Sequence, residues 1–156
     1  MLTSETQTPN TNSARIMNEL IVSLTVPGEM PSQNSYERTH WAKRAREKKR
    51  WDRKIFAALK LSGAKFAKAV EGEKRTITIT VHRRRMLDED NVGAAPAKWV
   101  VDNVKLMRRV KVGRKQMVVP SGPGLIFDDD PKHAHIVIRP GPCTVSVPRV
   151  EIEISR

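Results

Sequence analysis

Hydrophobic and polar residues alternate along two segments of the chain. Isoleucine and valine alternate with threonine over residues 76–81 and with glutamate over residues 150–154. This is the period of a β-strand with one buried face. A β-branched run over residues 20–26, which ends at a Pro-Gly turn, and a further run over residues 134–139 predict two more strands.

A helical period replaces the strand period in the stretch that begins at Trp41. From Trp41 onward the chain favours helix, and its apolar residues recur at spacings of four, seven and eight, at Trp51, Ile55, Ala58 and Leu59. Ser62 and Gly63 end this helix. A second helix is expected between Pro96 and Met107, because proline is accepted at the first helical position.

Residues 108–119 contain a glycine between two short β-prone pieces rich in Lys and Arg, which predicts a basic hairpin. Residues 122–133 are expected to form a turn, a short apolar segment and an acidic loop. The predicted fold is therefore a single α+β domain with a mixed or antiparallel sheet and two main helices. We expect it to span residues 18–156, after a disordered lead over residues 1–17.

The charge of the chain suggests its partner. Among 156 residues, 29 Lys and Arg face 17 Asp and Glu, for a formal net charge of +12. Such a surplus destabilises a compact protein by self-repulsion unless a polyanion shares its surface, so nucleic acid is the first partner to consider. No apolar run reaches the roughly 18 residues of a membrane span. The lone Cys143 cannot form an internal disulfide or a cysteine-based zinc site, which is consistent with the cytoplasm.

Acidic residues gather in two places of this basic chain, at Asp88-Glu89-Asp90 and at Asp128-Asp129-Asp130. In extended backbone, residues i and i+2 point to the same side, so Asp88 and Asp90 can direct their oxygens into one volume. Hard oxygen ligands suit Mg²⁺, or Mn²⁺ in its place, and a carboxylate from the second cluster would complete a site for phosphodiester hydrolysis. The alternative, that these aspartates are only turn residues and Asn91 only a helix cap, remains open.

Three basic segments form candidate DNA contacts. Nine Lys or Arg lie over residues 38–54, three arginines lie over 83–85, and six basic residues without any acid lie over 105–115. The candidates are Arg38, Lys43, Arg44, Arg46, Arg83, Arg84 and Arg85. For each single residue, a solvated surface position is the simpler alternative. Base stacking by an aromatic residue is less favoured than core packing, which we expect for Trp41, Trp51 and Trp99.

These motifs resemble the RusA-like family of Holliday junction resolvases. The resemblance runs from Leu20 to the C-terminus and is carried by LDEDN at 87–91, by Lys98 and Asp102, and by GLIFDDDP at 124–131. The segment PSQNSYERTHWAKR at 31–44 resembles the family's early turn and basic helix start.

The resemblance implies a homodimer that binds four-way DNA junctions and makes paired, symmetric nicks with Mg²⁺. It assigns the catalytic acids to Asp88, Asp90 and Asp129, a supporting metal ligand to Asp128, and the phosphate-contacting lysine to Lys98. Lys98 lies about one helical turn further along the chain than in the shortest family pattern. Residues 105–123 form an insertion before the third acid.

The leading hypothesis is thus a Mg²⁺-dependent endodeoxyribonuclease that acts on branched DNA and needs no small-molecule cofactor. A non-enzymatic basic nucleic-acid-binding protein is the main alternative, and a chain that keeps the fold but lacks activity is a third. For Lys98, the alternative role is an i,i+4 ion pair with Asp102 on the helix surface.

Overall fold

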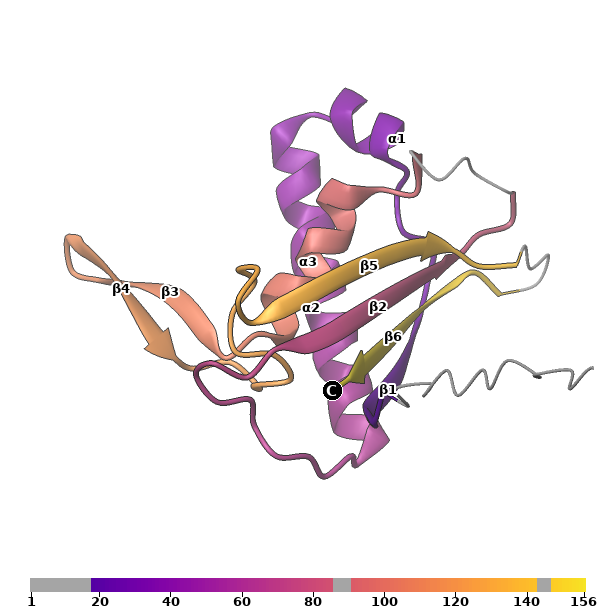
Figure 1. Cartoon of the computed structure of the whole chain (residues 1–156). Coiled ribbons are helices and arrows are strands. Elements are labelled where there is room, and N and C mark those ends of the chain that lie inside the picture. The colour runs from indigo at the N-terminus through magenta and orange to yellow at the C-terminus, as the bar shows by residue number, and fades with distance from the viewer. Residues whose placement is uncertain (1–17, 86–90, 143–146) are drawn as a thin grey trace, which may run out of the picture.

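The computed structural model describes residues 18–85, 91–142 and 147–156 (Figure 1). Its elements, in chain order, are β1 (Leu20–Pro27), α1 (Gln33–Arg38), α2 (Trp41–Ser62), β2 (Arg75–His82), α3 (Ala94–Val104), β3 (Met107–Val112), β4 (Lys115–Pro120), β5 (Ala134–Pro140) and β6 (Arg149–Ser155). None of the helices in the described ranges is long and apolar enough to cross a membrane.

Four strands form one sheet in the order β1-β6-β2-β5. The pairs β1·β6 and β6·β2 are antiparallel, whereas β2 and β5 run parallel, so the sheet is mixed. The alternating pattern predicts its buried face correctly, because Ile77, Ile79, Ile152 and Ile154 are fully buried. The predicted α+β class with a mixed sheet is confirmed.

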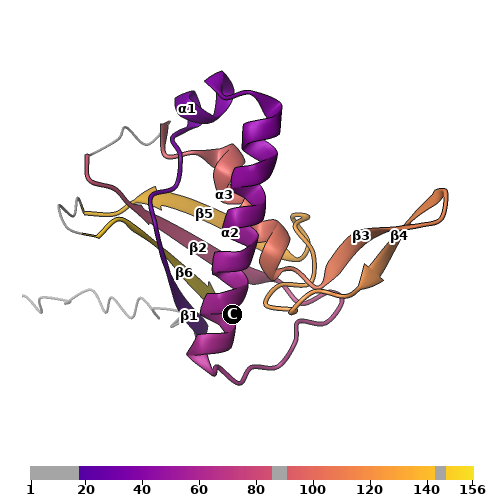
Figure 2. The same cartoon turned by 180° about the vertical axis from the view of Figure 1, so that it is seen from behind.

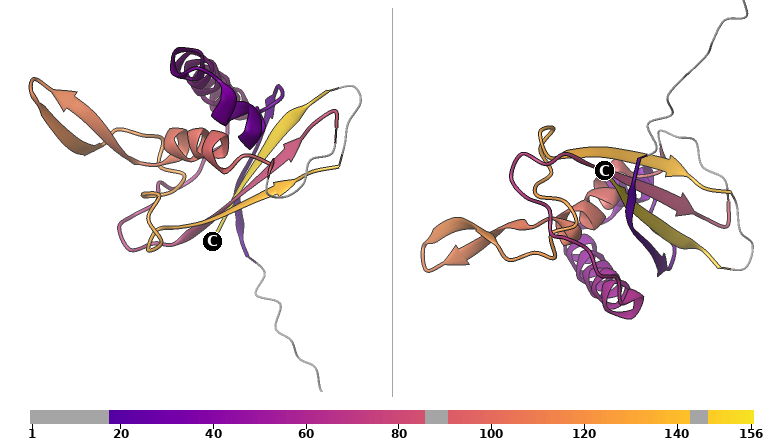
Figure 3. Two further views of the ribbon diagram at one scale, coloured as in Figure 1. Left: turned by 90° about the horizontal axis from the view of Figure 1, so that it is seen from above. Right: turned by 60° about the horizontal axis from the view of Figure 1, so that its bottom comes forward.

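Helices α2 and α3 lie against one face of this sheet (Figures 2 and 3). Trp51 and Ile55 of α2 and Trp99 and Val100 of α3 enter the hydrophobic core together with the sheet's isoleucines. Short helix α1 contacts α3, where the ring of Tyr36 meets that of Trp99 edge to face with centroids 5.7 Å apart. The sheet and the two long helices therefore share one core.

The helix ends follow local chemistry. Helix α2 ends as predicted at Gly63, whose φ of 56° is the left-handed conformation that glycine adopts at low cost. Helix α3 begins two residues before Pro96, which lies in the first turn, where a missing backbone N–H breaks no helical hydrogen bond. The prediction that this helix continues to Met107 is wrong. The Met107 amide instead donates to the carbonyl of Phe127 (3.0 Å), and Met107 begins a strand.

Strands β3 and β4 form the predicted basic hairpin, which is a separate two-stranded sheet. It projects from the body of the molecule (Figures 1 and 3). The two-residue turn at its tip, Gly113-Arg114, has a φ of 62° at Gly113, the sign that a type II′ hairpin turn requires at this position. At its other end the hairpin is joined directly to α3, with only Lys105 and Leu106 between α3 and β3.

Candidate active site

The apolar part of the segment GLIFDDDP positions the acids that follow it. Leu125 and Ile126 are fully buried, and the Leu125 amide donates to the carbonyl of Val104 at the end of α3 (2.9 Å). The guanidinium of buried Arg75 donates to the Leu125 carbonyl from the other side (3.0 Å). These contacts hold the start of the acidic loop against the C-terminal half of α3.

Three carboxylates of this region surround the ammonium of Lys105. Its Nζ lies 3.3 Å from Asp129 Oδ1, 3.6 Å from Asp128 Oδ1 and 3.6 Å from Asp102 Oδ1. The Lys105 side chain is mostly buried at 18% exposure, so its charge is only partly screened by water. The sequence did not single out Lys105 as a site residue, because it lay within a longer basic segment.

The charges of this cluster stabilise one another. Burial disfavours ionisation of Asp129, but a hydrogen bond with the Asp128 side chain and the charge of Lys105 outweigh it, so its pKa lies below the ordinary 3.8. Burial likewise disfavours the charged form of Lys105, yet attraction by Asp129, Asp102 and Asp128 raises its pKa above the ordinary 10.5. Both groups are therefore ionised at neutral pH.

Lys98 reaches the same cluster from one side. Its Nζ lies 4.0 Å from Asp129 Oδ2, and its side chain is 65% exposed. The alternative pairing of Lys98 with Asp102 is wrong. Within the described ranges, Lys98 pairs with Asp129, and Asp102 pairs with Lys48 (3.7 Å) and Lys105. A cavity of about 340 Å³ opens here, lined by Lys98, Asp102, Lys105, Met107, Arg109, Val118, Asp128 and Asp129.

The third acid of the loop has a different environment. Asp130 accepts hydrogen bonds from the backbone amides of Lys132 (2.9 Å) and His133 (3.1 Å) and from His133 Nδ1 (2.9 Å). The bond from His133 is the main cause of its lowered pKa. His133 Nε2 accepts the Gly72 amide hydrogen (3.0 Å), which leaves the ring proton on Nδ1, facing Asp130. Asp130 therefore stabilises a turn, whereas Asp128 and Asp129 face the cavity.

The predicted metal ligands Asp88 and Asp90 lie outside the described residues. Within the ranges that the structure describes, no group of three or more His, Cys, Asp or Glu side chains is arranged to hold a metal ion. The oxygens of Asp128 and Asp129 are hard donors of the kind that Mg²⁺ prefers, but here they are directed at Lys105. The donor chemistry fits Mg²⁺, and Asp88 and Asp90 would have to complete the set.

The residues on either side of 86–90 are held by contacts to the chain between β1 and α1 and to the first turn of α1. Asn91 Oδ1 accepts a hydrogen bond from the Asn34 amide (3.1 Å) in the first turn of α1, whose N-cap is Ser32. Asn91 is not the N-cap of α3 either, because that position is Gly93. On the other flank, Arg83 binds Glu29 (3.0 Å) and the Met30 carbonyl (2.8 Å).

The predicted DNA contacts differ in their freedom to bind a phosphate. The exposed ones are Arg38, Lys43, Arg46, Arg84 and Arg85. Arg83 is held by Glu29, and Arg44 donates to the Thr39 carbonyl (2.8 Å) with its guanidinium 4.9 Å from the centre of the Tyr36 ring. The exposed residues thus place charge at the end of α1, in the first turns of α2 and directly after β2.

The prediction for the tryptophans is correct for Trp51 and Trp99, which are buried, and wrong for Trp41. Trp41 is 71% exposed, because it is the first residue of α2 and lies beyond the apolar stripe that faces the sheet. Its exposed ring beside His40, with centroids 5.4 Å apart, adds an aromatic surface to the basic start of this helix.

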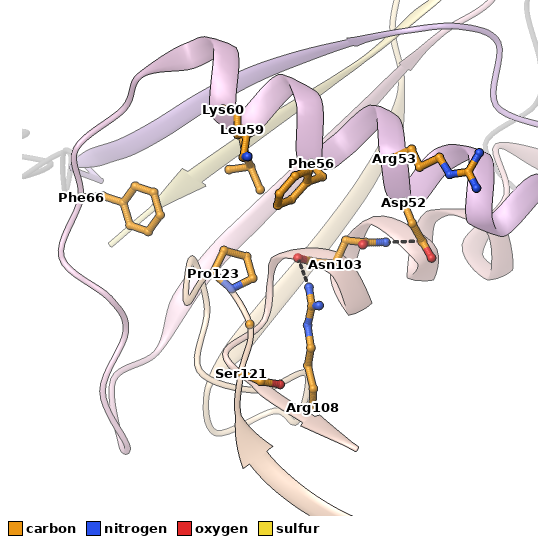
Figure 4. A pocket seen from close by; sticks show the side chains of 11 residues that line it. Asp52, Arg53, Phe56, Leu59, Lys60, Phe66, Asn103, Arg108, Ser121 and Pro123 are labelled. Carbon is orange, nitrogen blue, oxygen red and sulfur yellow. Dashed lines mark hydrogen bonds between the residues drawn. The ribbon is translucent and has the colours of Figure 1, made fainter. Parts of the chain in front are cut away.

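An apolar pocket of about 640 Å³ lies between α2 and the base of the hairpin (Figure 4). Its apolar lining comes from Phe56, Leu59, Phe66 and Pro123, and Arg108 reaches it from β3. The Arg108 guanidinium donates to the Asn103 carbonyl (2.8 Å), and the Asn103 amide donates to Asp52. The sequence did not predict this pocket, because its residues come from four separate segments.

Comparisons with protein-family models, with curated proteins and with solved structures found no match for this chain. The resemblance to the RusA-like resolvases therefore rests on the motifs of the sequence.

Proposed function

We propose that the protein is a Mg²⁺-dependent endodeoxyribonuclease that cuts branched DNA as a homodimer. The observation that carries the proposal is the meeting of Lys98 with Asp129 beside one open cavity, although 30 residues separate them in the sequence. These are the lysine and the third acid that the family resemblance assigns to catalysis. The net charge of +12 supports a polyanionic substrate.

In this proposal Asp129, supported by Asp128, holds Mg²⁺ together with Asp88 and Asp90. The bound ion would supply Lewis-acid chemistry at the phosphate and lower the pKa of the attacking water. Lys98 is exposed at the rim of the cavity, so its ammonium can approach a DNA phosphate and stabilise the negative charge that develops there. Hydrolysis leaves a 5′ phosphate.

Lys105 offsets the negative charge of the carboxylates that this proposal assigns to the metal. Two of the acids, Asp128 and Asp129, lie within 3.6 Å of its ammonium, which would repel a divalent cation at the same place. The Lys105 ammonium also lies 3.6 Å from Asp102, so its flexible side chain can pair with Asp102 alone. For Asp128 and Asp129 to hold Mg²⁺, the Lys105 ammonium would have to lie closer to Asp102 than to these two acids.

A non-enzymatic nucleic-acid-binding protein is the second candidate function. The exposed basic start of α2 with the exposed ring of Trp41 favours it, because cations beside an aromatic ring suit nucleic acid without any need for the acids. The two candidates differ in whether a phosphodiester bond is broken.

The test is incubation of the full chain with an end-labelled four-way junction or a matched linear duplex, with Mg²⁺ or with chelator, on a denaturing gel. Paired nicks are expected on the junction in Mg²⁺ alone. Asp129→Asn should lower cleavage at least about 100-fold with junction binding retained, because loss of even an outer partner of a metal ligand costs 10- to 100-fold.

The matched control is Asp130→Asn, the same change one residue further along the chain. Asp130 faces His133 rather than the cavity, so this variant should still nick the junction. Binding without nicks in both metal conditions would instead favour the binding protein. Equal loss of cleavage in both variants would argue against a catalytic role for Asp129.

A further inference from the structure

The two faces of the β3–β4 hairpin differ in chemistry. Cross-strand partners share a face, and the register pairs Met107 with Pro120, Arg109 with Val118 and Lys111 with Gln116. We call the face made by these six residues the inner face. The outer face consists of Arg108, Val110, Val112, Lys115, Met117 and Val119.

The inner face is continuous with the acidic cavity. Met107, Arg109 and Val118 line this cavity together with Lys98 and Asp129. On the outer face, Arg108 lines the apolar pocket beside α2 instead (Figure 4). A polymer bound in the acidic cavity would therefore contact the inner face where it extends out of the cavity.

The cations of the two faces also differ in their partners. Arg108 is half-buried and donates to the Asn103 carbonyl, so it serves the attachment of the hairpin. Arg109 and Lys111 are exposed, and neither forms an ion pair with any of the described acids. No Asp or Glu occurs in the sequence between Asp102 and Asp128. The inner face thus presents two cations that are free to bind phosphates.

The base of the hairpin is fastened to the segment that carries the acids. The amides of Leu106 and Met107 donate to the carbonyls of Ile126 (2.9 Å) and Phe127 (3.0 Å), directly before Asp128. Gly122 closes the base with a bond to the Leu106 carbonyl (2.9 Å), where a Cβ would lie 1.8 Å from the Lys105 carbonyl oxygen. These contacts fix the direction of the hairpin relative to the acidic cavity.

We propose that the inner face of the hairpin binds the backbone of the DNA strand next to the phosphate that is cut, with Arg109 and Lys111 on successive parts of this backbone. This inference rests on the proposed function for the identity of the polymer. The two side chains stand about 7 Å apart along the strand. Measured along the helix axis of B-form DNA, where one strand rises 3.4 Å per nucleotide, this spacing spans about two nucleotides.

The first test is photo-crosslinking to a labelled four-way junction in chelator, so that no cleavage occurs. In a Cys143→Ser background, Val118→Cys on the inner face and Met117→Cys on the outer face carry a thiol-linked azide. The two positions are neighbours with nearly equal exposure, 55% and 50%. Val118→Cys should crosslink several-fold more strongly. Equal crosslinking, a preference for Met117→Cys, or crosslinking by neither while the junction is bound would overturn the inference.

The second test measures the salt dependence of junction binding. Loss of two phosphate contacts in Arg109→Gln/Lys111→Gln should reduce the slope of log affinity against log salt by up to about 1.8. The matched control, Lys65→Gln/Lys74→Gln, removes the same charge from exposed positions between α2 and β2 and should leave the slope near that of the unchanged chain. An equal reduction in both variants would show a purely non-specific charge effect and contradict the inference.

Both tests measure binding, so they separate this inference from the proposed function. Inner-face crosslinking by a chain that never nicks the junction would support the DNA contact and contradict the nuclease. Nicking without a preference between Val118→Cys and Met117→Cys would support the nuclease and contradict the DNA contact. Failure of the chain to bind DNA at all would contradict both.

Discussion

The four-stranded sheet and the β3–β4 hairpin are both built from short β-prone segments and differ in what they do with the apolar side chains. In β2 and β6 the apolar side chains point into the core, and Ile79 and Ile152 are fully buried. In the hairpin no residue is buried, and Met117 and Val118 are about half exposed. The sheet is therefore held by its core, whereas the hairpin is held only at its base.

Their arginines show the same contrast. Arg75 of β2 is 1% exposed, and Glu73 and two backbone carbonyls, those of Ala67 and Leu125, accept its hydrogen bonds. Arg109 of β3 is exposed without an acidic partner among the described residues. A two-stranded hairpin alone is only marginally stable in water. Unpaired charges on such an element contribute little to folding, which favours a role in binding.

The largest expected difference between the two regions is the cost of truncating an apolar side chain. Ile79→Ala should lower the free energy of unfolding by about 4 kcal/mol, because it leaves a cavity in the core. Met117→Ala should change it by less than about 0.5 kcal/mol, as is usual for surface positions. Urea denaturation followed by circular dichroism measures both. A cost above about 2 kcal/mol for Met117→Ala would show that the hairpin is packed against something in solution.

A smaller effect is expected from breaking the ion pair of the buried arginine. Glu73→Ala leaves the Arg75 charge in the interior with only carbonyl partners, and loss of one partner of a buried pair is costly. We expect a loss of about 2–3 kcal/mol, since the two carbonyls remain. The control is Glu71→Ala, which removes an exposed carboxylate two residues away and should cost little.

The same pair predicts a pH dependence. Burial disfavours ionisation of Glu73, but hydrogen bonds from Arg75, Val70 and Arg156 outweigh it and lower its pKa below the ordinary 4.5. A carboxyl group whose pKa is lowered on folding contributes its stability above the unfolded pKa and loses it as the pH falls through the folded pKa. The stability difference between the unchanged chain and Glu73→Ala should therefore be constant near neutral pH and shrink below about 4.5. A constant difference down to pH 3 would contradict this assignment.

Local patterns predicted most of the fold. The period-2 and period-3.6 segments, the basic hairpin and the Gly63 helix end all follow from residues close in sequence, and the structure has them. The predicted end of α3 was wrong because the Met107 amide donates to the carbonyl of Phe127, which lies 20 residues further along the chain. The prediction that Trp41 packs in the core was wrong because composition does not tell which part of a helix faces the core. Tertiary contacts decide both.

The site could be predicted only where motif and spacing carried it. Asp128 and Asp129 face the cavity with Lys98. Asp88 and Asp90 lie outside the described residues, so their predicted roles stay predictions. Lys105 was missed as the common partner of Asp129 and Asp102, since nothing in a basic segment tells which lysine points toward the acids. Asp130 differs from its neighbours through its bonds to His133 and to the Lys132 amide, contacts that spacing alone does not reveal.

The smallest expected effect concerns the charge of Lys105 at the junction of body and hairpin. Lys105→Gln removes the ammonium 3.3 Å from Asp129, so the pKa of Asp129 should rise toward or above its ordinary value of 3.8. Carboxyl ¹³C NMR titration in chelator measures this shift. The control, Lys48→Gln, removes a cation that pairs with Asp102 alone and should leave the pKa of Asp129 nearly unchanged.

The lowered pKa of Asp129 determines how its contribution to the free energy of unfolding changes with pH. Its contribution is present at neutral pH and is lost as the pH falls through the folded pKa, and Lys105→Gln removes the part that comes from Lys105. Because the carboxylate is still 27% exposed, the neutral-pH cost should stay below about 1 kcal/mol. An unchanged Asp129 pKa in Lys105→Gln would mean that the ammonium does not hold this position in solution. The acids would then be free for a metal ion without any movement of Lys105.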